Sequence, residues 1–461
     1  MITPLSLSSR APALIRPAIA TLMLVAAGGL VRAGVGASLV PAVVILGAAV
    51  LAAAWSPPAG VGAVLLALPS MFDLEPMPRG SFSLLELAIL VAASGTAVHL
   101  LLRVMREGWQ PLREVRLPAE VLVPVAGLVV ATVVALLSLA DPAHRAESLR
   151  EVRLVIVEPL IFLGTTLVVC RDRAARAWAA AMFVTAGTVV SGLAIWQVIS
   201  GTGGVDAGAV TRATVSYPHP NNLAFFLERT LLFTGGALVL RPRSLPLWTL
   251  CAVQAMGVAA TFSRGAVLGV VAGLALVLLI LRMRRALLLL AGATAAVAAA
   301  ALAVAPDRVG DVGGAGAEPT RFAIWRSSMR MIADHPMLGV GPDQFLYQYW
   351  RRYVEPMGWP ERYTSHPHNL VLDAWLRLGV PGLAALVTLA LGLVRLVRQR
   401  LPRLRHDAIA LGAVGALFGG AMHGMVDNGF FLPDLAAMTW YFVTCVVTAE
   451  ARACGTEDGE P

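Results

Sequence analysis

The chain has 461 residues, of which 57% are hydrophobic and only 14% are charged, and its mean hydropathy is +0.74. Soluble domains carry about 25% charged residues, so this composition excludes a soluble globular protein and indicates a protein embedded in a membrane. The net charge is +8, and every basic side chain is an arginine. In a membrane protein such positive charge marks cytoplasmic loops, so we do not expect nucleic-acid binding.

Apolar runs long enough to cross, or nearly cross, a bilayer recur along the whole chain. They lie at residues 15–32, 34–54, 58–71, 83–102, 118–140, 153–170, 177–199, 222–240, 245–262, 265–281, 286–304, 369–394, 407–427 and 432–449. A helical span needs about 20 residues, so the third run is marginal. The pattern predicts an all-α polytopic integral membrane protein with about 12–14 transmembrane helices.

Clusters of arginine follow five of these runs, at residues 103–116, 171–176, 241–243, 282–285 and 395–405. If successive runs alternate in direction, all five clusters face the same side of the membrane. Cytoplasmic loops are enriched in basic residues, so that side is expected to be the cytoplasm, and both termini are expected to lie there.

The opposite face receives the longest polar segment, residues 305–368. Its apolar residues recur with helical spacing between residues 322 and 332, which predicts a largely helical external domain before the third-last helix. We therefore divide the chain into an N-terminal helix bundle (1–304), this extracytoplasmic loop domain, C-terminal transmembrane helices (369–449) and a short cytoplasmic tail (450–461).

Two histidines, His366 and His368, end the external segment where a new apolar helix begins. Asn369 is well suited to cap that helix. An imidazole at this place lies beside the positive end of a helix dipole, which disfavours its protonated form. A neutral histidine near pH 7 can take a proton from a hydroxyl group, so this stretch predicts a general base.

Four arginines are expected on the same external face: Arg150, Arg153, Arg264 and Arg321. Guanidinium groups that face one cavity repel each other unless an anion lies between them, and phosphate or pyrophosphate is the natural anion. The alternative for Arg264 is an interface anchor at a corner between two helices, where Gly265 is expected to permit a close turn.

Other polar residues have structural interpretations beside functional ones. Glu158 lies inside an apolar run, so it serves function directly or pairs with the arginines at the mouth of that helix. His219 lies between prolines ahead of a helix, which favours a capping or turn role over a place in the site. His423 and Asp427 share one helix face, and hydrogen bonding between helices is favoured over bracing the site. The Gly339-Val340-Gly341-Pro342 sequence reads more as a structural turn than as an anion nest.

Metal ions and cofactors are not expected. The cysteines are Cys170, Cys251, Cys445 and Cys454. Their spacing suggests neither a disulfide framework nor a zinc site. Pro367 between His366 and His368, with no carboxylate at a companion spacing in the sequence, also argues against a zinc site.

Several short motifs in a fixed order carry a resemblance. They are Ser263-Arg264-Gly265, Arg321 with Trp325, Asp334-His335-Pro336 through Gly341, and His368-Asn369-Leu370 followed by Leu378-Gly379-Val380-Pro381-Gly382. With a long external loop just before the histidine, this order resembles the O-antigen ligase and polymerase family of bacterial envelope glycosyltransferases. The resemblance covers about residues 140–430.

The resemblance implies a multi-pass protein of the bacterial cytoplasmic membrane that moves a glycan from undecaprenyl pyrophosphate to an acceptor hydroxyl at the periplasmic face. It implies His368 as the base on that hydroxyl, with Arg264, Arg321 and one or both of Arg150 and Arg153 holding the pyrophosphate. Direct displacement by a single base would invert the anomeric carbon. The residues expected to support this site are Glu158, His219, His366, Asn369, His423 and Asp427.

The acceptor is left open between a lipid A core, a growing polymer and a protein hydroxyl, with a ligase-like activity favoured over a polymerase. A polytopic lipid-glycan transporter is the main alternative, since buried carboxylates such as Glu158 or Glu228 can couple to protons. The chain lacks the repeated halves typical of transporters. A non-catalytic assembly scaffold would require neither the buried carboxylates nor the convergence of arginines.

Overall fold

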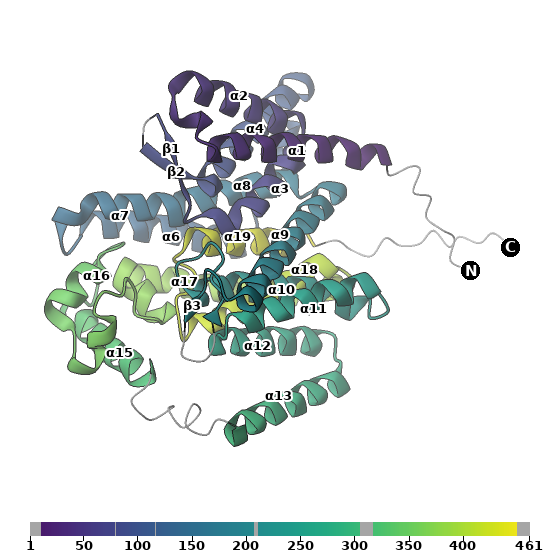
Figure 1. Ribbon diagram of the computed structural model, residues 1–461. Helices are drawn as coiled ribbons and strands as arrows, with labels where there is room; N and C mark the ends of the chain where they lie inside the picture. Colours follow the sequence, from purple (N-terminus) through teal and green to yellow (C-terminus); the bar gives the residue numbers. More distant parts are fainter. Residues whose placement is uncertain (1–10, 79, 116, 207–210, 305–316, 450–461) are drawn as a thin grey trace.

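The computed structural model of the protein describes residues 11–78, 80–115, 117–206, 211–304 and 317–449. The chain is almost wholly helical, as the sequence predicts, and the helices lie side by side in one bundle (Figure 1). The tail at 450–461 and residues 305–316 of the predicted external domain lie outside the described residues.

Each apolar run predicted from the sequence coincides with a helix. Within the described residues, seven helices are long and apolar enough to cross a membrane. They are α1 (Ala11–Arg32), α4 (Leu84–Glu107), α6 (Ala119–Leu137), the continuous helical stretch Pro142–Val169 with α7 (Arg145–Val152) and α8 (Glu158–Val169), α9 (Arg173–Ser200), α10 (Pro220–Leu240) and α17 (Leu370–Leu404).

Six further apolar helices are shorter: α2 (Leu39–Trp55), α3 (Pro57–Ala67, extended by a 3-10 turn to Ser70), α11 (Leu245–Ala260), α12 (Arg264–Ile280), α18 (Ala408–Gly424) and α19 (Pro433–Val447). Helix α13 (Arg284–Val304) and the short α5 (Gln110–Glu114) complete the bundle. The run at 58–71, marginal by length, is divided between α3 and its 3-10 turn.

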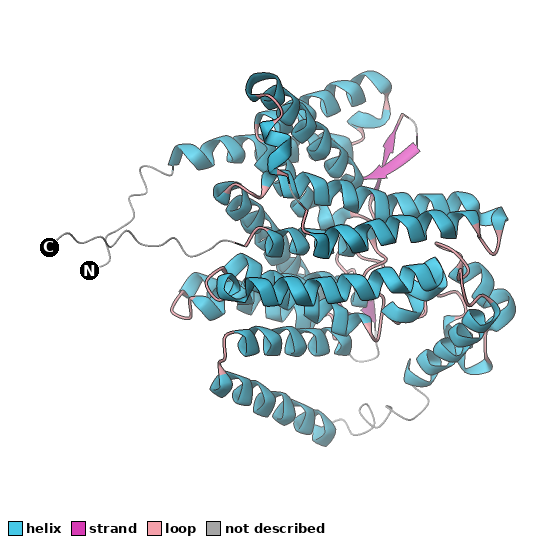
Figure 2. Cartoon of the chain, turned by 180° about the vertical axis from the view of Figure 1, so that it is seen from behind, coloured by secondary structure: helices cyan, strands magenta, loops and turns pink. Residues whose placement is uncertain are grey.

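Two hairpins are the only strands in the described residues: β1 (Leu74–Met77) with β2 (Gly80–Ser83), and β3 (Val205–Asp206) with β4 (Thr211–Arg212). Both lie in connections between helices. Figures 1 and 2 show the start of α1 and the end of α19 at one end of the bundle, away from α15 and α16.

The described part of the predicted external domain is a small helical layer with its own apolar core. It contains α15 (Ala317–Asp334), α16 (Phe345–Gln348), a π-helical turn (Tyr349–Tyr353) and a 3-10 helix (Pro356–Glu361). Ile324, Met331, Phe345 and Tyr349 pack together with Leu376 of α17. The layer is therefore anchored to the first turns of that helix.

The turn at Gly339 ties this layer to a kink in α17. The amides of Val340 and Gly341 both donate to the Leu376 carbonyl, so they are occupied and the turn is structural. Gly379 interrupts the helix with φ of 67°, and a Cβ there would lie 2.4 Å from the Met337 carbonyl oxygen. Only glycine fits this conformation and this contact.

Close packing of α10, α12 and α18 brings their loops to one end of the bundle. A Cβ on Gly236 would lie 2.4 Å from the Cα of Gly412, and one on Gly269 would lie 2.9 Å from the Gly419 carbonyl oxygen. Small residues allow helix backbones in membranes to approach this closely. The start of α10, the start of α12 and the end of α18 consequently meet.

Candidate active site

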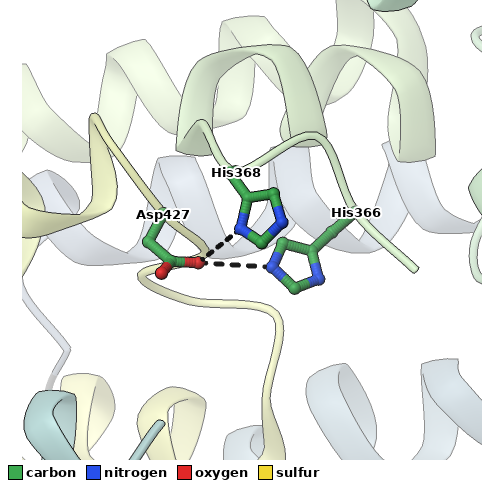
Figure 3. A group of neighbouring side chains, drawn as sticks. All are labelled: His366, His368 and Asp427. Atoms are coloured by element: carbon green, nitrogen blue, oxygen red, sulfur yellow. Dashed lines mark hydrogen bonds and ion pairs between the residues drawn. The ribbon is translucent and has the colours of Figure 1, made fainter. Parts of the chain in front are cut away.

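Two histidines and one aspartate form the centre of the site (Figure 3). Nδ1 of His368 lies 3.0 Å from Oδ1 of Asp427, and Nε2 of His366 lies 3.3 Å from the same oxygen. The histidines precede α17, whereas Asp427 follows α18. Asp427 is therefore a partner of both rings, and not only a polar contact between helices.

A second carboxylate faces the other side of the His368 ring. Nε2 lies 2.9 Å from Oε2 of Glu361, at the end of the 3-10 helix, and 3.3 Å from the hydroxyl of Thr364. Burial lowers the pKa of His368, but the hydrogen bonds to Asp427 and Glu361 outweigh it and raise the pKa to about 9.

The expectation of a neutral His368 near pH 7 is therefore wrong for this conformation. A helix dipole contributes about 0.3–1 kcal/mol, and direct contact with two carboxylates outweighs it. His366 behaves differently, because burial and the neighbouring His368 lower its pKa. Burial raises the pKa of Asp427, yet the hydrogen bonds from both histidines hold it well below its ordinary value.

The backbone around His368 is tightly held. His368 has a φ of 51°, a left-handed conformation that is uncommon for a residue with a side chain. The Asn369 side chain accepts hydrogen bonds from the amides of Val371 and Leu372 and so caps α17, as predicted, while its Nδ2 donates to the Met425 carbonyl. This cap fixes the histidine loop against the segment that carries Asp427.

A cavity of about 110 Å³ is lined by three arginines from three segments of the chain. Arg212 ends β4, Arg264 begins α12 and Arg321 lies near the start of α15. Partial burial lowers the pKa of Arg212, and the positive charges of Arg264 and Arg321 lower it further. The cavity is much smaller than the roughly 300–1,000 Å³ of pockets for drug-sized ligands, so it suits a phosphate group better than a sugar.

Asp427 joins this cavity to the histidines. Its Oδ2 accepts a hydrogen bond from Asn221 (2.9 Å) and lies 3.8 Å from the Arg321 guanidinium. Asn221 in turn accepts a hydrogen bond from Arg212 at 3.0 Å. The cavity and the base candidate therefore belong to one continuous site.

Arg150 and Arg153, expected beside the anion, do not line this cavity. Arg153 pairs with Glu86 (2.7 Å) and with Glu158 (2.8 Å), the ion pair that the sequence suggests for Glu158. Arg150 is exposed. Burial raises the pKa of Asp343, and the positive charge of Arg150 partly offsets that rise. The positive charge of Arg153 is thus already compensated by two carboxylates.

His219 and His423 have structural contacts at the edge of the site. Nδ1 of His219 accepts a hydrogen bond from the Asn221 amide and caps α10, the role favoured from the sequence. Nδ1 of His423 lies 2.9 Å from Glu228, and its ring stacks on Phe225. His423 also lines the arginine cavity, where it contacts the start of α12.

Gly265 has a different role from the expected one. The chain reverses at Phe262, which has a φ of 50°, whereas Gly265 lies within the first turn of α12. A Cβ on Gly265 would lie 2.3 Å from Cδ2 of His423. The glycine therefore makes room for the histidine ring, and the turn itself does not depend on it.

His366, His368 and Asp427 are also the group among the described residues that could hold a metal ion. Their ligand atoms lie within 4.8 Å of one another. Imidazole nitrogens with a carboxylate suit a transition-metal cation. Asp427 lies about sixty positions after the two histidines. The sequence analysis considered only carboxylates close to the histidines in the chain, so it did not predict this pairing.

Arg212, Asn221 and Glu361 are site residues that the sequence analysis missed. Arg212 is the one arginine in the expected external segment 200–221, and that isolation was a usable signal. Glu361 precedes His368 by seven residues in a segment rich in charge, so nothing local distinguished it.

The fold and this site define the class of the protein: a polytopic, all-α membrane protein with a histidine–aspartate pair beside an arginine-lined cavity. Residues 249–387 match the family model described as O-antigen ligase. The match supports assignment of the chain to the O-antigen ligase family, and with it an O-antigen ligase or polymerase type of membrane glycosyltransferase. No curated protein matches the chain.

The matched segment contains much of the site but not all of it. It includes Arg264, Arg321, Glu361 and both histidines of the loop, 366 and 368. Arg212 and Asp427 lie outside it. Tertiary packing therefore adds an arginine and the shared carboxylate to the residues of the matched segment.

Proposed function

We propose that the protein is a glycosyltransferase of the bacterial cytoplasmic membrane that transfers a glycan from undecaprenyl pyrophosphate to an acceptor hydroxyl at the extracytoplasmic face. The family match supports the type of activity. The observation that carries the finer proposal is the arginine cavity joined through Asp427 to His368. The arginine cavity suits a pyrophosphate leaving group, and His368 suits the role of a base.

Pyrophosphate is assigned to Arg212, Arg264 and Arg321. The N-termini of α10, α12 and α17 also converge on this site, and each is capped by a side chain, from His219, Ser263 and Asn369. Helix N-termini favour anions through their dipoles and free amide groups. Arginines and helix ends together stabilise the negative charge that develops on the leaving group.

His368 is assigned as the base in its neutral form, with Nδ1–H donating to Asp427 and with the acceptor hydroxyl replacing Glu361 as the partner of Nε2. Nε2 takes the hydroxyl proton while the acceptor oxygen forms a bond to the anomeric carbon. The bond from that carbon to the pyrophosphate oxygen breaks, and its electron pair leaves on the pyrophosphate. Because one displacement occurs, the anomeric configuration inverts.

The favoured acceptor is a lipid A core, as for a ligase, and a growing glycan chain is the alternative, as for a polymerase. Both acceptors present a hydroxyl and require the same site. The proposed mechanism uses no metal ion, so it differs testably from one that uses His366, His368 and Asp427 as ligands.

Reconstitution tests this proposal. Purified protein in proteoliposomes receives a crude pool of undecaprenyl-pyrophosphate glycans, candidate acceptors and a chelator. The variants are His368→Ala and, as a matched control from the external layer, His335→Ala. We expect wild type and the control to transfer glycan with inversion in the presence of chelator, and His368→Ala to transfer none.

Three results would count against the proposal. Loss of wild-type activity on chelation would favour the metal centre, and a retained anomeric configuration would exclude direct displacement. Movement of lipid-linked glycan across the bilayer by wild type and His368→Ala alike, without transfer, would identify a transporter. The acceptor that is consumed separates a ligase from a polymerase.

A further inference from the structure

His423 is a buried histidine of the arginine cavity that the proposed mechanism does not use. It lies near the end of α18 and lines the cavity beside the start of α12. Its side chain is only 1% exposed, so it meets the cavity and not bulk water. Because Nδ1 contacts Glu228 at 2.9 Å, Nε2 is the ring nitrogen left for a ligand. Among the described residues, Nε2 has no hydrogen-bond partner.

Neighbouring groups hold the His423 ring in this position. One face of the ring stacks on Phe225, with ring centres 3.6 Å apart and an angle of 12° between the planes. A Cβ on Gly265 would lie 2.4 Å from Nε2, so only glycine leaves room beside this nitrogen. A ring that is already fixed loses little conformational freedom when a ligand binds to it.

Glu228 is the acidic group behind this ring. It is fully buried, and its Oε1 has no hydrogen-bond partner in the part of the chain that the structure describes. The neighbouring Arg229 donates to the carbonyls of Leu435 and Gly429 instead. A buried carboxylate is costly unless a positive group pairs with it. His423 is in contact with Glu228, and it is positive when both of its ring nitrogens carry hydrogen.

The charges around the ring respond to an anion in the cavity. Four arginines disfavour a further positive charge on the ring: Arg212, Arg264 and Arg321 at the cavity and Arg229 over the Phe225 ring. The carboxylate of Asp427 is held by the two histidines of the loop. A phosphate between the arginines offsets their charge and adds a negative group beside Nε2. The ring then lies between two acidic groups.

We propose that His423, backed by Glu228, donates from Nε2–H to the phosphate held by the arginines, and that the His423–Glu228 pair takes up a proton when this anion binds. Negative groups at both ring nitrogens favour hydrogen on each of them. The proton comes from solvent and stays on the pair, so no bond to the glycan forms or breaks at His423. This inference rests on the proposed function, because it deepens the assignment of pyrophosphate to this cavity.

Isothermal titration calorimetry of the purified full-length protein with inorganic pyrophosphate tests this proposal. Titrations at about pH 8 in two buffers of different ionisation enthalpy give the number of protons exchanged for each bound anion. His423→Gln keeps a polar side chain that cannot become charged. We expect it to take up fewer protons than wild type, by up to about one per site. It should also bind pyrophosphate about tenfold more weakly.

His99→Gln is the matched control, since His99 is a half-buried helical histidine whose Nδ1 lies 3.1 Å from the Ala54 carbonyl and which does not line the arginine cavity. It should match wild type in affinity and in proton uptake. Glu228→Gln keeps an oxygen that can accept from Nδ1 and removes the acidic group. It should also take up fewer protons, and it decides the question if His423→Gln does not fold.

The outcomes separate this inference from the proposed function. Proton uptake equal to that of wild type in every folded variant would overturn the inference, even if affinity falls, because His423 would then only shape the cavity. The pyrophosphate assignment would stand in that case. If wild type binds no pyrophosphate, the inference and the pyrophosphate assignment both fail.

Discussion

At the scale of single residues, the site depends on Asp427. This buried carboxylate accepts from His366, His368 and Asn221 and lies near Arg321. It holds Nδ1 of His368, while Nε2, the nitrogen assigned to the chemistry, faces Glu361. The histidine alone would be a weak and poorly oriented base, and the two carboxylates around it make it a stronger one.

The pH dependence of transfer follows from these carboxylates. His368 accepts a proton only when it is neutral, and its pKa is raised to about 9. Activity should therefore rise with pH through neutrality and level off above about pH 9. Glu361→Gln removes one of the negative charges that raise this pKa, so the rise should move to lower pH.

Initial rates measured between pH 6 and pH 10 check this shift. Glu355→Gln is the matched control, because Glu355 pairs with Arg326 and Arg330 elsewhere in the external layer. Its pH profile should follow that of wild type. If the Glu361→Gln profile also follows wild type, Glu361 does not control the protonation of His368.

The arginine cavity predicts a second effect on rate. Removal of one preorganised donor to a developing negative charge lowers turnover by about 10²–10³-fold. We expect Arg212→Ala to reduce turnover by about this factor, although Arg212 lies outside the segment that matches the family. Arg362→Ala, which removes an arginine stacked on exposed Trp359 and Tyr363, should leave the rate unchanged.

Single-turnover measurements in proteoliposomes separate the chemical step from donor binding for these two variants. Equal rates for Arg212→Ala and wild type would remove Arg212 from the pyrophosphate site. If Arg212→Ala changes only the affinity for the donor, then Arg212 binds the donor and does not stabilise the leaving group.

At the scale of elements, three sharp loops shape the site. Val215, Phe262 and His368 have positive φ values of 53°, 50° and 51°, and each lies shortly before a helix that begins at the site. Such conformations are rare for residues with side chains and cost about 1–3 kcal/mol each. The packing of α10, α12 and α17 holds them, so these helix N-termini keep their positions around the cavity.

Gly265→Ala tests this fit between elements. The added Cβ would lie 2.3 Å from the His423 ring, so the ring or the start of α12 must move and the arginine cavity must change shape. We expect a loss of transfer activity of tenfold or more. Gly235→Ala in α10 is the control, since a Cβ there meets nothing within 4 Å.

Thermal unfolding followed in detergent distinguishes a local effect from a general one. A glycine in an exposed helix interior costs about 1 kcal/mol relative to alanine, so Gly235→Ala should be at least as stable as wild type. Full activity of Gly265→Ala would show that the contact between α12 and His423 is not needed for the site.

At the scale of the whole molecule, the candidate active site lies at one end of the bundle, and the start of α1 and the end of α19 lie at the other end (Figure 1). The arginine clusters favour a cytoplasmic position for the end with the start of α1 and the end of α19. Transfer at the extracytoplasmic face requires this orientation, in which both termini are cytoplasmic.

Cysteine labelling checks the orientation. Cys170, Cys251 and Cys445 are buried. In a Cys454→Ser background, Met357→Cys in the external layer should react with a membrane-impermeant maleimide in intact cells. Arg285→Cys, in one of the arginine clusters, should react only after the membrane is opened. The reverse pattern would place the site in the cytoplasm.

Sequence alone predicted the helical membrane class, the positions of the apolar helices, the cap at Asn369 and the histidine loop. Each of these depends on residues close together in the chain, namely a hydrophobic run of sufficient length or a capping side chain. The same local motifs carried the family resemblance, which the match over residues 249–387 supports.

Only the tertiary structure decided which polar groups meet. Asp427 reaches His368 across 59 positions, and Arg153 is drawn to Glu86 and Glu158, away from the arginine cavity. The protonation of His368 follows from the same packing. Helix periodicity is a property of neighbouring residues, but such pairings depend on how separate helices dock, and the docking here is fixed by close glycine contacts such as that of Gly236 with Gly412.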